Sequence, residues 1–335
     1  MDKKLKNTFD NLWRVVGNTP MLELHYRYKG KSGKVYAKLE YYNLSGSLKD
    51  RMALHILQQA YIKDKIRPED RIVEATSGNT GISFATIGKA LGHQVTIIMP
   101  NWLSKERIDI IKSLGADIKL ISKEDGGFLG SIKLSQEMAT SGGIYLPRQF
   151  DNCDNIRAHY LTTGPEIMRQ LVTRGKHTDA FIAGVGTGGT VMGVGTFLKA
   201  VYPKTKVYPL EPTESPTLST GHKIGAHRIQ GISDEFIPSI CSLNLLDEVT
   251  AVNDGDAILA AQKLAKHLGL AVGISSGANI IGAIKINAKL NHRATVVTVI
   301  ADDNKKYLST DLVKDEPEKD SYLSPEIVFD GYETL

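Results

Sequence analysis

The sequence has few cysteines, few tryptophans, little net charge and no long apolar run, and each shortage excludes a class of protein. Two cysteines, Cys153 and Cys241, cannot build a disulfide framework or a zinc site of paired cysteines. No apolar run approaches the roughly 18 residues of a membrane span, and the N-terminus lacks the apolar segment of a signal peptide. A net charge of +4 and two isolated tryptophans do not favour nucleic-acid binding. We therefore expect a cytoplasmic protein with no membrane and no nucleic-acid partner.

The composition is that of a globular chain, and its modest positive charge surplus outside the tail suits small anionic ligands. Hydrophobic residues make up 41% and charged residues 23% of 335 residues, enough for about two domains with buried cores. The nine histidines show no HxxxH or similar ligand spacing, so we expect no metal site. Residues 311–335 carry eight acids and only two lysines. This acidic tail could dock on the body, dock on a second subunit or be disordered.

Short apolar runs alternate with segments of helical period, a pattern that predicts right-handed crossovers and a mostly parallel sheet. The expected strands are 35–39, 71–74, 94–99, 117–121, 179–184, 206–210, 248–252 and 295–300. The expected helices are 49–64, 81–91, 104–114, 128–140, 155–172, 190–201, 256–268 and 278–290. A loop as long as 213–238, with little periodicity, is usually functional or disordered.

The most conspicuous motif is a glycine-rich turn, GVGTGGT at 184–190, which follows an apolar strand and opens a helix. Glycines let the backbone approach an anion, and the first N–H groups of a helix point at it. The turn also fits the Gly-x-Gly-x-x-Gly pattern of dinucleotide binding, with Glu211 where a ribose-binding acid would lie. The motif alone therefore leaves a phosphate site, a nicotinamide site and a simple packing turn as alternatives.

Three further turns place polar groups at the start of a helix. TSGNTG at 76–81 suits a carboxylate, but it also suits an ordinary capped helix, and GISSGA at 273–278 could equally hold an N-cap serine. In NLSGSLKDR at 43–51, Lys49 lies in the first helical turn, where the helix dipole disfavours a cation. A buried lysine there would lose its proton easily, as a Schiff-base lysine must, whereas an exposed lysine would have no such role.

In this order, the four turns resemble those of the cysteine synthase and cystathionine β-synthase family, which are pyridoxal-phosphate enzymes of fold type II. The joint order and spacing of the motifs carry the resemblance, which covers residues 12–310. Further matching segments are VGNTPMLEL at 16–24, MPNWLSKERIDIIKSLGA at 99–116, TTGPEI at 162–167, HRIQGISDEFIP at 227–238 and KKYLST at 305–310.

The resemblance implies a two-domain α/β fold like that of the tryptophan synthase β-subunit, each domain being a mostly parallel twisted sheet flanked by helices. The smaller domain would span 41–151. The larger domain, which would bind pyridoxal 5'-phosphate, would combine 1–40 with 152–335 and include the acidic tail. A homodimer is expected because relatives form one, and the tail of an acyltransferase is a candidate partner.

The resemblance also implies roles for particular residues. Lys49 would hold pyridoxal 5'-phosphate covalently and later move the α-proton of the substrate. Asn79 would hydrogen-bond the ring hydroxyl oxygen, and Ser275, or else its neighbour Ser276, would face the ring nitrogen. An acidic residue would keep that nitrogen protonated and so stabilise a carbanion at Cα, whereas a neutral serine does not. A serine at this position therefore favours prompt loss of the β-substituent. The other expected contacts are the phosphate cradle of Gly186, Thr187, Gly188, Gly189 and Thr190, and the substrate-carboxylate site of Thr76, Ser77, Thr80 and Gln149.

One segment departs from the pattern of the sulfide-using cysteine synthases. Where these usually carry small residues, this chain reads GISDEFIP at 231–238, which is closer to the bulkier, acidic version of the cystathionine β-synthases. The Asp234 carboxylate could act as a general base for a nucleophile that must lose a proton, or it could be a solvated charge on a mobile loop. Sulfide scarcely needs such a base, whereas water or an amine does.

We therefore expect β-elimination or β-replacement on L-cysteine, L-serine or an activated L-serine, through an aminoacrylate and with hydrogen sulfide as co-substrate or product. The alternative within this chemistry is a cysteine-consuming enzyme that releases hydrogen sulfide and forms serine, lanthionine or cystathionine, with Asp234 as base. The alternative outside it is a nicotinamide-dependent oxidoreductase, which leaves Lys49 and two of the turns unexplained.

Overall fold

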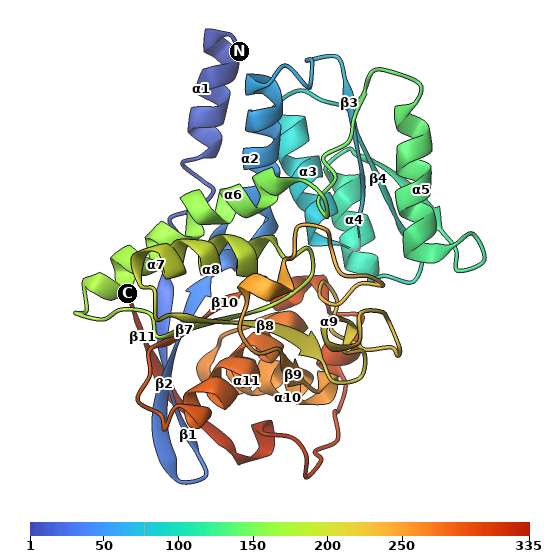
Figure 1. Cartoon of the computed structure of the whole chain (residues 1–335). Coiled ribbons are helices and arrows are strands. Elements are labelled where there is room, and N and C mark those ends of the chain that lie inside the picture. The colour runs from blue at the N-terminus through green and yellow to red at the C-terminus, as the bar shows by residue number, and fades with distance from the viewer. Residues whose placement is uncertain (77) are drawn as a thin grey trace.

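The computed structural model describes residues 1–76 and 78–335 and contains two sheets, each flanked by helices (Figure 1). The larger sheet has the strand order β11-β1-β2-β10-β7-β8-β9, and its pairs are parallel from β2 to β9. The smaller sheet, β5-β4-β3-β6, is parallel throughout. The prediction of an α/β fold with mostly parallel sheets is confirmed.

All the expected strands and helices recur within a few residues, except that the helix expected at 155–172 is divided in two. The helices Lys3–Leu12 and Thr217–Thr220 and the strands Met21–Tyr28, Ile144–Tyr145 and Ile327–Thr334 were not predicted. The strands are β1 (Met21–Tyr28), β2 (Lys31–Leu39), β3 (Arg71–Ala75), β4 (Val95–Pro100), β5 (Asp117–Ile121), β6 (Ile144–Tyr145), β7 (Ala180–Gly184), β8 (Lys206–Pro212), β9 (Thr250–Val252), β10 (Val296–Ile300) and β11 (Ile327–Thr334). The helices are α1 (Lys3–Leu12), α2 (Lys49–Ile62), α3 (Asn79–Ala90), α4 (Lys105–Ser113), α5 (Gly127–Ala139), α6 (Cys153–Leu161), α7 (Thr163–Val172), α8 (Gly189–Val201), α9 (Thr217–Thr220), α10 (Asp254–Leu268) and α11 (Ile274–Lys289).

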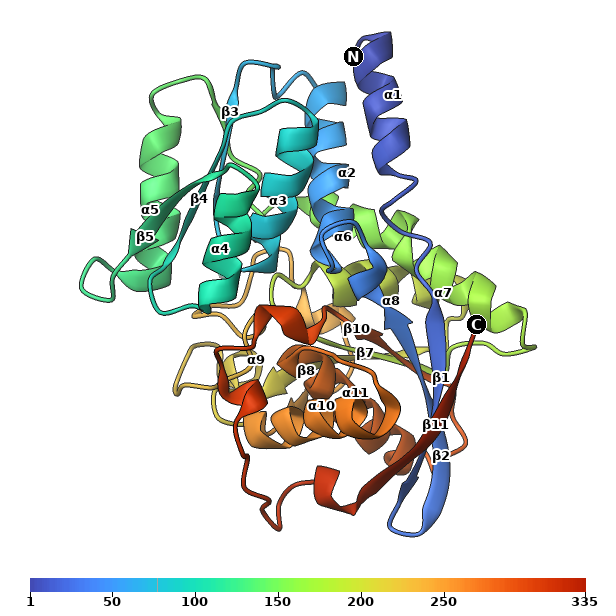
Figure 2. The ribbon, with the colours of Figure 1, turned by 180° about the vertical axis from the view of Figure 1, so that it is seen from behind.

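Both faces of the larger sheet are buried, which explains why its central strands read as continuous apolar runs. In β7, Ala180 and Ile182 pack with α10 and α11, whereas Phe181 and Ala183 pack on the opposite face with α7 and α8. In the smaller unit, α5 covers one face of the sheet and α2, α3 and α4 cover the other (Figures 1 and 2). Among the described helices, none is both long and apolar enough to cross a bilayer.

The domain boundaries at 41–151 stay a prediction, and one contact crosses them. The strands of the smaller sheet all lie inside this range, and those of the larger sheet lie outside it. However, Phe9 and Leu12 of α1 are buried in the core cluster of the smaller unit, together with residues of α2 and α3. The first helix therefore packs with the smaller unit although its sequence precedes the predicted boundary.

The acidic tail docks on the body of the protein. Its last segment forms β11, which pairs antiparallel with β1 at the edge of the larger sheet, as Figure 2 shows from behind. An exposed ion pair between Arg27 and Asp330, 2.8 Å apart, joins the two strands.

The predicted helix at 155–172 is in fact two helices, because the backbone breaks at Thr162, with φ −122° and ψ −68°.

A buried ion network ties the two units together beside the start of α2. Arg51 donates from Nε to Glu40 at 2.6 Å and from Nη1 to Glu166 at 2.7 Å, and Lys38 pairs with Glu166 at 2.8 Å. The Arg51 and Lys38 side chains are fully buried. Arg51 holds the pKa of Glu166 down, to about 2, against the effect of burial. Because α2 begins at Lys49, this network fixes the helix that carries the predicted catalytic lysine.

We expect Arg51→Met to lower the free energy of unfolding by about 3–5 kcal/mol, because it leaves the buried Glu40 without its ion-pair partner and Glu166 with Lys38 alone. Urea unfolding followed by circular dichroism measures this loss. The matched control is Arg27→Met at the exposed pair with Asp330, which should cost less than about 1 kcal/mol. Equal losses in the two variants would contradict a structural role for the network.

Candidate active site

The predicted motifs converge on one inner cavity at the carboxyl ends of parallel strands, where ligands bind in open α/β sheets. Thr76 follows β3, Gly184 ends β7 and Ala301 follows β10, and all three line this cavity. Of the predicted site residues, Lys49, Thr76, Asn79, Thr80, Gln149, Gly186, Thr187, Thr190, Asp234 and Ser275 line it as well. Gly188 and Gly189 lie in the same turn without lining the cavity, and Ser77 lies outside the described residues.

Lys49 has the environment that a reactive lysine needs. It is the first residue of α2, and its backbone N–H donates to Ser47 Oγ at 3.3 Å. Burial lowers the pKa of Lys49 to about 8, although the charges of Asp234 and Asp302 raise it. At pH 7 about a tenth of the side chains are therefore neutral amines, the nucleophilic and basic form, which is far more than for an ordinary lysine.

The glycine-rich turn leaves no room for side chains on the backbone that would cradle a phosphate. A Cβ on Gly186 would lie 2.3 Å from the Gly231 carbonyl oxygen, and one on Gly189 would lie 2.0 Å from Asn155 Oδ1. Gly188 has φ +83°, which L side chains rarely adopt, and it immediately precedes α8. The bare backbone and the helix N-terminus together form a good anion site.

The expected carboxylate site is preorganised by hydrogen bonds between its own members. Thr80 Oγ1 donates to Gln149 Oε1 at 2.6 Å, and Gln149 Nε2 donates to the Ala75 carbonyl at 2.8 Å. Thr76 Oγ1 accepts from the Gly78 N–H at 3.1 Å. These residues come from β3, α3 and the loop before α6, so the fold brings together positions that are more than 60 residues apart.

The neighbouring serines differ in what they contact. Ser276 is fully buried and turned to the backbone, because its Oγ accepts from the Ala301 N–H at 2.9 Å and donates to the Asp302 carbonyl at 3.4 Å. Ser275 instead lines the cavity. This difference favours Ser275 over Ser276 as the serine that would face the cofactor ring.

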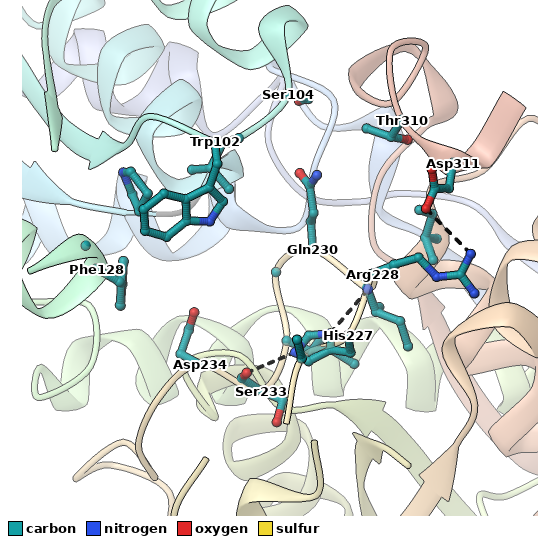
Figure 3. Close-up of a pocket in the computed structure, with 18 of the residues that line it drawn as sticks. Trp102, Ser104, Phe128, His227, Arg228, Gln230, Ser233, Asp234, Thr310 and Asp311 are labelled. Carbon is teal, nitrogen blue, oxygen red and sulfur yellow. Dashed lines mark hydrogen bonds and ion pairs between the residues drawn. The ribbon is translucent and has the colours of Figure 1, made fainter. Parts of the chain in front are cut away.

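Asp234 lies where the inner cavity meets a larger outer cleft of about 990 Å³. Figure 3 shows side chains of both units around this cleft, with Trp102 and Phe128 on one side and Arg228 and Asp311 on the other. Burial raises the pKa of Asp234 to about 6, although the Lys49 charge lowers it. An acid with a pKa near neutrality is suited to proton transfer.

Two hydrogen bonds from Ser233 to buried residues hold the loop that carries Asp234 in place. Ser233, at φ +52°, donates its N–H to the Val185 carbonyl at 2.8 Å and its Oγ to the Ser215 carbonyl at 2.9 Å. Glu235 lines the outer cleft without reaching the inner cavity, and it pairs with Lys223 at 3.3 Å. The description of a solvated charge therefore fits Glu235, whereas Asp234 is a wall of the cavity.

Sequence reasoning missed several residues around the site. Asn155 donates from Nδ2 to Thr187 Oγ1 and to the Gln149 carbonyl, both at 2.9 Å, and thereby links the predicted phosphate and carboxylate sites. Arg107 lines the inner cavity, and Asp302 accepts a hydrogen bond from Asn79. Arg107 lies within a segment that carries the family resemblance, whereas nothing in the local sequence marks Asn155 or Asp302.

The residues present fit pyridoxal phosphate. The bare glycine turn can take a phosphate, and Lys49 offers an amine of lowered pKa. The side-chain oxygen of Asn79 is buried and has no hydrogen-bond partner within the described part of the chain.

Glu211, in contrast, is wrongly placed for the ribose of a dinucleotide, because its buried carboxylate accepts from the Leu218 N–H at 2.7 Å and from Ser219 in α9. The oxidoreductase alternative is therefore not supported.

A family model described as "Pyridoxal-phosphate dependent enzyme" matches residues 12–302. The chain belongs to this family. It is 41% identical to the cysteine synthase of Staphylococcus aureus over 303 residues, which are 90% of this chain and 96% of that protein. The predicted resemblance and the cofactor are thus confirmed, and the protein is a pyridoxal-phosphate-dependent enzyme with cysteine synthase-like β-elimination or β-replacement chemistry on a small amino acid.

Solved structures of this pyridoxal-phosphate-dependent family match nearly the whole chain. The hydrogen sulfide-producing enzyme of Fusobacterium nucleatum superposes with a TM-score of 0.96 at 52% identity, covering 98% of this chain and 99% of that one. An aspartate-to-asparagine mutant of the same enzyme, in complex with an α-aminoacrylate intermediate, gives a TM-score of 0.95 at 52% identity and covers 98% of both chains. The fold type II architecture is thereby confirmed.

Proposed function

We propose that this enzyme consumes L-cysteine, releasing hydrogen sulfide and adding water to form L-serine, with Asp234 as the base that activates the water. The Cβ–S bond breaks and a Cβ–O bond forms, so cysteine and water balance serine and hydrogen sulfide without an oxidant or reductant. The observation that carries the proposal is the position of the Asp234 carboxylate between inner cavity and outer cleft. The sulfide-producing enzyme of Fusobacterium nucleatum, at 52% identity, supports the same direction.

The need for a base distinguishes water from sulfide as the nucleophile. Bulk water has a pKa of about 15.7 and attacks carbon slowly unless a positioned group takes its proton. Sulfide is a good nucleophile near neutral pH without such help. The Asp234 carboxylate, with a pKa of about 6, lines the inner cavity in which the substrate would react. Such a group is useful chiefly to an enzyme whose nucleophile must lose a proton.

Pyridoxal phosphate, when bound, supplies an electron-withdrawing ring that makes the Cα–H bond of an amino acid acidic and the β-substituent easier to expel. The chain's residues would hold it at three points: Lys49, Asn79 with Ser275, and the glycine turn with Gly186, Thr187, Gly188, Gly189 and Thr190. Thr76, Thr80 and Gln149 would bind the substrate carboxylate, with Ser77 as a further predicted contact.

Two groups of this chain would then move protons. Lys49 would take the proton from Cα and return it to Cα after water has added, because its lowered pKa leaves part of the side chain as a free amine. Asp234 takes a proton from the water that enters from the outer cleft. The charges of the two groups stabilise each other, since Lys49 lowers the pKa of Asp234 and Asp234 raises that of Lys49.

The pH dependence of serine formation should show the titration of Asp234. Its carboxyl must be deprotonated to act as a base, so with a pKa of about 6 we expect kcat for serine formation at saturating cysteine to fall about tenfold per pH unit below pH 6. In Asp234→Asn this acidic limb should disappear from the residual rate. A wild-type rate that stays flat down to pH 4.5 would show that no group with this pKa takes part.

A second candidate function is cysteine synthesis from an activated serine and sulfide, and the 41% identity to a cysteine synthase supports it. The test is to incubate the holoenzyme either with L-cysteine or with O-acetyl-L-serine plus sulfide, and to quantify sulfide and amino acids. Rapid sulfide and serine formation from cysteine supports our proposal. If the enzyme only forms cysteine, the proposal is refuted in favour of the second function. If lanthionine or cystathionine forms in place of serine, the nucleophile is a thiol and not water.

The homodimer, the acyltransferase tail as partner and the cytoplasmic location stay predictions. Apolar surface suited to a second copy supports the dimer. Val15, Tyr42 and Leu44 are 48%, 60% and 43% exposed. They lie on adjacent segments, because the Gly17 N–H donates to Asn43 Oδ1 at 2.7 Å.

A further inference from the structure

A buried carboxylate outside the predicted site contacts one of its members directly. Asp302 follows β10 and is fully buried. Its Oδ2 accepts two hydrogen bonds, both 2.7 Å long, from Asn79 Nδ2 and from the Tyr307 hydroxyl. Its charge also raises the pKa of Lys49, against the larger effect of burial. Asp302 is therefore coupled to two of the residues that would hold the cofactor.

The contact joins the two units of the fold beneath the cavity. Asn79 opens α3 and Arg107 lies on α4, both in the smaller unit, whereas Asp302 and Tyr307 belong to the segment after β10 of the larger sheet. The guanidinium of Arg107 stacks over the Tyr307 ring, 4.6 Å from its centroid, and is buried. Asp302 thus binds Asn79 of the smaller unit directly, and Tyr307 packs against Arg107 of the same unit.

We propose that Asp302 is a positioning residue of the active site, which fixes the orientation of the Asn79 amide toward the cofactor. The proposal rests on the cofactor-binding role proposed above for Asn79. It concerns how the site is held together and is independent of which nucleophile replaces sulfur.

The chemistry of the two side chains explains why a carboxylate is needed. An asparagine amide has a donor end and an acceptor end of nearly the same shape, so packing alone does not decide which end faces which way. A carboxylate only accepts, and it therefore selects the amide nitrogen of Asn79. One N–H of Asn79 is then held by Asp302, and the second N–H remains for an acceptor such as the ring hydroxyl oxygen. Asn79 itself lines the cavity.

Asn79 and Asp302 each keep one further oxygen atom that no described residue satisfies. Asn79 Oδ1 and Asp302 Oδ1 are buried and make no hydrogen bond to any described residue. Buried polar atoms without partners are rare in folded proteins and call for an explanation such as a bound group. A Cβ on Gly273 would lie 2.1 Å from Asp302 Oδ1, so glycine at 273 is required for the carboxylate to fit.

The test compares Asp302→Ala and Asp302→Asn with the neighbouring control Asp303→Asn. Alanine removes the acceptor, whereas asparagine keeps the size and can still accept but no longer selects the amide nitrogen of Asn79. Asp303 caps a short helix through the Lys305 N–H at 3.2 Å, which asparagine can also do. The readouts are the dissociation constant of pyridoxal 5'-phosphate from reloaded apoenzyme, the absorption maximum of the bound cofactor and the thermal midpoint of the apoenzyme.

We expect Asp302→Ala to raise the dissociation constant about 10- to 100-fold, the range for a lost hydrogen bond to a charged group. Asp302→Asn should raise it less and shift the absorption maximum, and Asp303→Asn should match the wild type in both. If Asp302→Ala does not fold, the absorption maximum of the cofactor bound to Asp302→Asn is the measurement that tests the proposal. Wild-type affinity and spectrum in Asp302→Asn, or in both Asp302 variants, would overturn the proposal.

A double-variant cycle separates positioning from a general loss of structure. If Asp302 acts through Asn79, the variant with both Asn79→Ala and Asp302→Ala should bind the cofactor no more weakly than Asn79→Ala alone. Additive losses would mean that Asp302 acts by another route and would refute the proposal. An Asn79→Ala variant with wild-type affinity would instead refute the proposed role of Asn79, which the product analysis above does not touch.

Discussion

Replacing Lys49 by alanine should lower the turnover of L-cysteine by about 10³- to 10⁴-fold, the largest effect that we expect from a single substitution. Lys49 lines the inner cavity at the start of α2, and burial lowers its pKa to about 8. The variant loses both the amine that would hold the cofactor and the base that would take the α-proton. The rate of sulfide release by the cofactor-loaded variant measures this loss.

The matched control for Lys49→Ala is Lys305→Ala, because the Lys305 side chain is 80% exposed. It should retain turnover within about twofold, as expected for a surface substitution. Borohydride reduction followed by peptide mass spectrometry should place the cofactor on the peptide that contains Lys49. Cofactor attached to another lysine, or a tenth or more of the wild-type rate in Lys49→Ala, would contradict the assignment.

Asp234→Asn should slow steady-state serine formation by about 10²- to 10³-fold while leaving the first release of sulfide intact. Asparagine has nearly the same shape but cannot take a proton from water. Because breaking the Cβ–S bond does not depend on that base, rapid mixing with cysteine should still show about one sulfide per active site before turnover stalls.

Glu235→Gln is the control for the Asp234 substitution. Glu235 is the next residue along the same loop, yet it pairs with Lys223 at 3.3 Å rather than facing the inner cavity. We expect its rates to stay within about threefold of the wild type. If the two variants behaved alike, the loop charge as a whole, and not the Asp234 carboxylate, would be responsible.

The central parallel strands of the larger sheet could be predicted because both faces of that sheet are buried, as the alternating partners of Ile182 and Phe181 in β7 show. β1 was missed although the sequence carries a strand signal there, because Leu22, Leu24 and Tyr26 alternate with polar residues at the period of two of a half-buried strand. β11 was missed because it lies in the acidic tail and depends on pairing with β1, 300 residues away in sequence. Local patterning does not report such distant pairing.

The site was predictable where a motif is local and unpredictable where it depends on tertiary contacts. The four helix-opening turns could be read from glycines and hydroxyl side chains, and the structure brings them to one cavity. That Asp234 faces this cavity while Glu235 faces Lys223 follows from the bend at Ser233, with φ +52°. The contact of Asp302 with Asn79 spans 223 residues and leaves no trace in either local sequence.

The most direct test of the proposed reaction is to incubate the holoenzyme with L-cysteine in heavy-oxygen water and to analyse the amino acids by mass spectrometry. If water replaces sulfide at Cβ, serine should form with one heavy oxygen in its hydroxyl group, in amounts equal to the sulfide released. Asp234→Asn should form this labelled serine far more slowly. Sulfide released without labelled serine, or no sulfide from cysteine at all, would contradict the proposal.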